Sequence, residues 1–135
     1  MNTRLILTAL IFVIALGLSP RTVQAEHHEG GPKVLQVFTI EVAAKDRPAV
    51  LTRLAELQKI LSKEGQPGFR VWLGTYAGDG VGQLFVTVER QNYADFGINQ
   101  SKVMASGAVN KWIEDINNSG LSKVVRQSLL TEVTP

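Results

Sequence analysis

The sequence contains no cysteine among its 135 residues. This absence excludes a disulfide scaffold, a zinc site built on cysteines and catalysis by a thiol. Histidine is scarce as well, because His27 and His28 are the only two and both lie in a polar stretch near the N-terminus. A Ser-His-Asp arrangement therefore has no histidine available in the part of the chain that is predicted to fold.

An excess of charge of one sign is also missing. The chain has 14 Lys and Arg residues against 12 Asp and Glu residues, and Arg4 and Arg21 belong to a distinct N-terminal segment. Without that segment the numbers of basic and acidic groups are equal, and no cluster of basic residues remains. A protein that binds nucleic acid usually carries such a cluster, so the sequence predicts no DNA or RNA partner.

The first 25 residues predict a signal peptide. Arg4 provides a positive start, an apolar stretch runs over residues 5–18, and Ala25 ends a group of small residues that suits cleavage. The alternative is a membrane anchor, but a span needs about 20 apolar residues and this stretch is shorter. We therefore expect a secreted or periplasmic protein that is not attached to a membrane after cleavage.

Residues 26–33 (EHHEGGPK) are polar and rich in glycine, which predicts a flexible arm. If cleavage follows Ala25, Glu26, His27 and His28 become the first three residues. The terminal amine, two backbone amides and the imidazole of His28 could then hold Cu(II) or Ni(II) in a square plane. The alternative is a solvated arm that binds nothing, and the sequence predicts no other cofactor.

The remaining residues, 34–135, predict one domain. Alternating apolar residues predict strands over residues 34–43, 69–77, 84–90 and 124–133, and GDGVG at 78–82 predicts a hairpin turn. Asp46 can cap a first helix that stops at Gly65, and Asn92 can cap a second helical region that we expect to be divided or kinked near Gly97 and Gly107. Apolar residues recur at helical spacing on both helical segments and predict core positions: Val50, Leu54, Leu57 and Leu61 on the first, and Val109, Trp112, Ile113 and Ile116 on the second.

The order strand-helix-strand-strand-helix-strand predicts an α+β ferredoxin-like sandwich, in which helices cover one face of a four-stranded antiparallel sheet. Alternation assigns nine apolar residues to the helix-covered face: Phe38, Ile40, Val42, Phe69, Val71, Leu73, Leu84, Val86 and Val88. The opposite face receives three large aromatic side chains, Trp72, Tyr76 and Phe85. Each such ring buries about 150–250 Å² when it is covered, so we expect two copies to pair sheet against sheet as a homodimer.

Four segments carry a family resemblance: VLQVFTIEVA, DRPAVLTRLAELQKILSKEG, GFRVWLGTYAGDGVGQLFVTVE and NYADFGINQSKVMASGAVNKWIEDI. Together they resemble the dimeric α/β-barrel superfamily, which includes antibiotic-biosynthesis-monooxygenase-like proteins. The resemblance implies that two ferredoxin-like subunits form a dimeric α/β barrel. It does not imply one reaction, because the superfamily contains oxygenases, isomerases, haem-handling enzymes and members without known activity. The absence of histidine from the folded part argues against a mechanism that uses a barrel histidine or histidine-ligated haem.

Five residues are candidates for a ligand site inside the predicted barrel: Arg70, Trp72, Tyr76, Glu41 and Glu89. An aromatic lining with a few polar groups is typical of small-molecule sites. The alternative is an interface core in which Arg70 pairs with a glutamate across strands. Two functions follow: an exported dimeric barrel that binds a small organic ligand or serves as a non-catalytic module, or a cofactor-independent monooxygenase-like enzyme that acts on a planar organic substrate. No catalytic residue is assigned.

Overall fold

A computed structural model of the chain describes residues 31–76 and 78–133. The predicted signal peptide, its cleavage site and most of the predicted arm lie outside these residues, so export remains a prediction. Within the described part of the chain, no helix is both long and apolar enough to cross a membrane.

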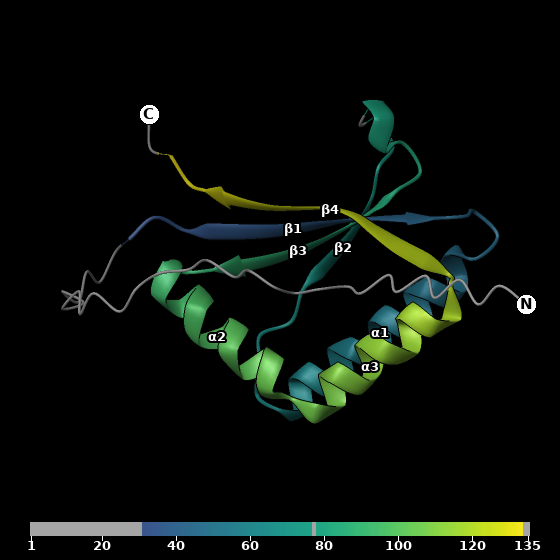
Figure 1. Ribbon diagram of the computed structural model, residues 1–135. Coiled ribbons are helices and arrows are strands. Elements are labelled where there is room, and N and C mark those ends of the chain that lie inside the picture. The colour runs from purple at the N-terminus through teal and green to yellow at the C-terminus, as the bar shows by residue number, and fades with distance from the viewer. Residues whose placement is uncertain (1–30, 77, 134–135) are drawn as a thin grey trace, which may run out of the picture.

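The described residues form an antiparallel sheet and three helices (Figure 1). Their order is β1 (Val34–Val42), α1 (Arg47–Lys63), β2 (Arg70–Leu73), a 3-10 turn η1 (Gly78–Gly80), β3 (Leu84–Arg90), α2 (Tyr93–Ala105), α3 (Gly107–Ser119) and β4 (Ser122–Thr131). The four strands lie side by side in the order β2-β3-β1-β4, and the helices lie on one side of the sheet. This confirms the predicted α+β ferredoxin-like fold.

The central strand β1 pairs with both β3 and β4. Phe38 lies opposite Val86 in the β1–β3 ladder, and Ile40 lies opposite Leu84. The pairing with β4 shifts register between Thr39 and Ile40, so the ladder contains a local irregularity. Because of the β1–β3 register, the alternating apolar side chains of both strands lie on the face that the helices cover.

Strand β2 ends at Leu73, earlier than the predicted end at residue 77. The reason is a close approach within the hairpin, where a Cβ added to Gly74 would lie 2.3 Å from the carbonyl oxygen of Gly80. The amide of Gly82 also donates to the carbonyl of Gly74, over 2.8 Å. The chain therefore leaves the sheet at Gly74, and Tyr76 belongs to the loop and not to a strand.

Helix α1 begins at Arg47, but the predicted side-chain cap at Asp46 is wrong. Asp46 has a helical backbone conformation, with φ −94° and ψ −10°, and its side chain makes no capping hydrogen bond. The amides of Asp46 and Arg47 instead donate to the carbonyl of Ala43, at 2.9 and 3.2 Å. A backbone turn therefore leads the chain into the helix.

The second helical region is divided at Ser106, next to one of the two predicted positions. Ser106 has an extended backbone, and its Oγ accepts a hydrogen bond of 3.1 Å from the amide of Val109. The same hydroxyl donates to Oε1 of Glu64 over 2.7 Å, which ties the start of α3 to the end of α1. The predicted cap at Asn92 is confirmed, because its Oδ1 accepts from the amide of Asp95 over 2.9 Å.

The core lies between the sheet and helices α1 and α3. Its buried members are Ile40, Val50, Leu54, Leu61, Phe69, Leu84, Val86 and Val109. Phe38, Val42, Val71 and Val88 pack against this core, as the alternation predicted. Leu73 lies opposite the buried Leu84 and so shares its face, as predicted, but it is 45% exposed at the end of the edge strand β2.

We expect Ser106→Ala to lower the free energy of unfolding by about 1–2 kcal/mol, because it removes the cap of α3. Urea denaturation followed by circular dichroism measures this change. The control is Ser101→Ala on α2, where the exposed hydroxyl donates only to the carbonyl of Gly97. This control should change stability by less than about 0.5 kcal/mol, and equal effects of the two variants would contradict the capping role.

Candidate functional site

A cavity of about 170 Å³ lies between the sheet and the helices. Its walls come from β1, β3, β4, the three helices and the segment before β2, and they are mainly apolar. Cavities of about 150 Å³ with leucine, isoleucine and phenylalanine walls stay dry and can bind benzene. The space is therefore large enough for one aromatic ring or a short branched chain.

Five polar side chains interrupt this apolar lining: Gln36, Arg90, Gln100, Asn117 and Ser122. The side chain of Gln36 is nearly inaccessible, since the residue is 4% exposed, and its Nε2 is buried with no hydrogen-bond partner among the described residues. A buried amide without a partner costs free energy, because it has lost its hydrogen bonds to water. Gln36 is thus a donor left available at the cavity.

Arg90 is also buried, with 7% of its surface exposed. In the β1–β3 ladder Val34 lies opposite Arg90 and Gln36 lies opposite Val88. Residues two positions apart on a strand point to the same face, so Gln36 and Arg90 are diagonal neighbours on the face that the helices cover.

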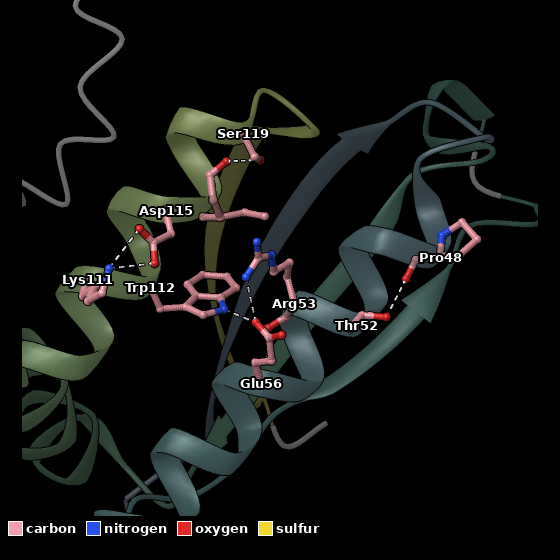
Figure 2. Close-up of polar contacts among 9 residues, drawn as sticks. Pro48, Thr52, Arg53, Glu56, Lys111, Trp112, Asp115 and Ser119 are labelled. Carbon is pink, nitrogen blue, oxygen red and sulfur yellow. Dashed lines mark hydrogen bonds and ion pairs between the residues drawn. The ribbon is translucent and has the colours of Figure 1, made fainter.

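Trp112 of α3 forms part of the cavity wall. Its Nε1 donates to the carbonyl of Arg53 on α1 over 2.8 Å, and Figure 2 shows the indole between the two helices. On the α1 side, Arg53 also pairs with Glu56 at 3.1 Å. Trp112 packs against the core, as predicted, and it also borders the cavity.

The residues predicted as a ligand site lie on the other face of the sheet. Arg70, Trp72 and Glu89 line an open hollow of about 610 Å³, together with Phe85 and Thr87. The indole Nε1 of Trp72 donates to Oγ1 of Thr87 over 2.8 Å. These three candidates are therefore neighbours on the uncovered face.

The other two candidates do not line this hollow. Glu41 lies opposite Lys123 in the β1–β4 ladder, and Tyr76 is fully exposed in the loop after β2. Glu89 forms an ion pair of 3.5 Å with Lys33. The cross-strand pair expected between Arg70 and a glutamate is not among the ion pairs of the described residues.

The predicted metal ligands Glu26, His27 and His28 lie outside the described residues. Within residues 31–76 and 78–133, no group of three or more histidine, aspartate or glutamate side chains is placed to hold a metal ion. Copper or nickel binding at a processed N-terminus stays a prediction.

Gln36 and Arg90 were not among the predicted site residues, although the alternation contains a signal for both. Gln36 occupies a helix-facing position between Val34 and Phe38, and Arg90 follows Leu84, Val86 and Val88 at the same spacing. A polar residue in such a series either has a buried partner or borders a cavity. The structure shows that both residues border the cavity.

No protein-family model matches the sequence, and no curated protein matches it. A solved structure from Deinococcus radiodurans, described as a "putative antibiotic biosynthesis monooxygenase", is similar to the chain with a TM-score of 0.49 and 14% sequence identity. The similarity covers 76% of this chain and 92% of that protein. The ferredoxin-like assignment rests on the order of elements and strands described above.

We expect Gln36→Leu to raise the free energy of unfolding by about 1 kcal/mol, because it removes a buried donor that has no partner. The matched control is Gln58→Leu. The Gln58 amide donates to the carbonyl of Phe69 and accepts from its amide, both at 3.1 Å. This control should lower stability by about 1–3 kcal/mol. Chemical denaturation of both variants measures the difference, and a loss of stability in Gln36→Leu would show that Gln36 is satisfied.

Proposed function

We propose that the protein binds a small, mainly apolar organic molecule in the cavity between its sheet and its helices. The buried Nε2 of Gln36, which has no partner among the described residues, is the observation that carries this proposal. An oxygen atom of a ligand would supply the missing acceptor, while the apolar walls would cover the rest of the molecule. Apolar cavities with a few placed donors are the usual form of small-molecule sites.

The chemistry of the wall supports binding more than turnover. The described residues that line the cavity supply amide, guanidinium, indole and hydroxyl groups but no carboxylate, imidazole or phenol that could take a proton. The alternative, a cofactor-independent monooxygenase-like activity on a planar organic substrate, would use the same space. Oxygen consumption in the presence of a bound substrate distinguishes an enzyme from a binding protein.

The two tryptophans provide a test of where a ligand binds, because Trp112 borders the cavity and Trp72 lies on the uncovered face. We expect benzamide to shift the ¹H–¹⁵N indole signal of Trp112 and to leave that of Trp72 in place. A Trp72→Phe variant assigns the signals. If Trp72 alone responds, the ligand binds at the site predicted from the sequence, and if neither responds the proposal is wrong.

A cavity-filling variant controls for non-specific contact. Val103→Phe on α2 adds a ring to the wall and should abolish the response of Trp112 to benzamide. Ile98→Phe adds the same ring to an exposed position of α2, where Ile98 is 58% exposed, and should preserve the response. Circular dichroism establishes that both variants are folded.

We further propose that two copies pair through the uncovered face of the sheet as a dimeric α/β barrel. Trp72 and Leu130 are each 51% exposed on this face, and Trp72 lies opposite Phe85 in the β2–β3 ladder. Leu130 lies opposite Leu35 in the β1–β4 ladder, which extends the apolar surface across the sheet. Apolar surface of this extent is commonly covered by a partner, and a second copy presents the same surface.

Sedimentation velocity tests the dimer. We expect the domain from residue 26 onward to sediment as a dimer and Trp72→Arg to shift it to the monomer, because the twofold axis brings two new charges into one apolar interface. Ile98→Arg places the same charge on α2, on the helix side of the molecule, and should leave the dimer intact. A folded monomer of the unmodified protein at high concentration would refute the proposal.

A further inference from the structure

The cavity wall contains the positive charge of Arg90, which has few hydrogen-bond partners among the described residues. The guanidinium of Arg90 makes one hydrogen bond in the described part of the chain, from Nη1 to the backbone carbonyl of Glu89 over 3.0 Å. The ion pairs found within 4.0 Å among the described residues do not include Arg90. A guanidinium has five N–H donors, so most of its hydrogen-bonding capacity has no protein partner there.

Asp95 is the acidic residue that acts on Arg90 electrostatically, but its oxygens are already engaged. Its Oδ1 accepts from Nδ2 of Asn99 over 2.6 Å, and its Oδ2 accepts from the amide of Gln91 over 3.2 Å. Burial lowers the pKa of Arg90, and the charge of Asp95 opposes this shift. Desolvation of the guanidinium by burial has the larger effect on this pKa, and the attraction to Asp95 has the smaller one.

Arg90 and Gln36 are arranged so that one ligand group could accept hydrogen bonds from both side chains. They are diagonal neighbours on adjacent strands, they project from the same face, and both line the cavity. Arginine presents parallel N–H groups that match the two oxygens of a carboxylate, and the Gln36 amide adds a neutral donor. Most of the remaining lining residues are apolar, so the carboxylate and the apolar body of a ligand would have different surroundings.

We infer that the cavity ligand is a small carboxylate whose anionic group lies between the Arg90 guanidinium and the Gln36 amide and whose apolar body fills the space beside Trp112. This inference rests on the proposed function and names its ligand class. The carboxylate replaces water around a buried cation, and the apolar body is limited to about one ring by the 170 Å³ of the cavity.

Sodium benzoate and benzamide test the inference, because they have nearly the same shape and differ in charge at neutral pH. We expect the full domain to bind benzoate about tenfold more tightly than benzamide, since hydrogen bonds to charged groups are stronger than those between neutral groups. Titration of the Trp112 indole signal gives both dissociation constants. Equal binding of the two compounds would overturn the inference and leave the proposed function standing, whereas failure of both would overturn the function itself.

Arg90→Met removes the charge and keeps an unbranched side chain, which is shorter and apolar. This variant should lose the preference for benzoate and still bind benzamide, and the retained benzamide binding would establish that the cavity is intact. The control is Arg126→Met, because Arg126 lies opposite Thr39 on the exposed strand β4, outside the cavity lining. It should retain the full preference, and a similar loss in both variants would show that long-range charge is responsible and would overturn the inference.

A second variant keeps the inference testable if Arg90→Met does not fold. Gln36→Glu places a carboxylate from the protein next to Arg90, where the ligand group is expected. It should weaken benzoate binding at least tenfold, because the cation is already paired and a like charge repels the ligand. Benzamide binding should change much less, and undiminished benzoate binding would contradict the placement between these two residues.

Discussion

The pairing of β1 with β3 is the constraint on which both faces of the molecule depend. Side chains alternate along a strand, so a shift of one residue would move Phe38 and Ile40 out of the core and would bring Val37 and Thr39 in. The same register also directs Gln36 into the cavity wall. The apolar core and the position of Gln36 in the cavity wall are therefore consequences of one alignment.

Much of the fold could be predicted because its signals are local. Alternation in β1 and β3 and the capping side chain of Asn92 depend on neighbours in sequence, and these predictions are confirmed. The early end of β2 could not be predicted, since it results from the approach of Gly74 to Gly80 across the hairpin. The missing cap at Asp46 has a local cause, because Asp46 takes a helical backbone conformation within a turn whose amides donate to the carbonyl of Ala43.

The candidate site was less predictable than the fold. The sequence indicates which residues share a face, and Arg70, Trp72 and Glu89 do lie together on the uncovered one. It does not indicate that the covered face is incompletely filled, because the volume left between layers depends on how the helices pack. Gln36 and Arg90 become informative only when that volume is known, since a polar residue on an apolar face could equally have a protein partner.

Helix α2 differs from the other two in how it is anchored. It buries only Asn99 among its described residues, whereas α1 buries Val50, Leu54 and Leu61, yet Gln100 and Val103 of α2 form part of the cavity wall. Segments with few buried apolar contacts open at a lower free energy than the sheet they cover. Under the proposed function, a ligand would therefore enter and leave the cavity by local opening of α2, without global unfolding of the domain.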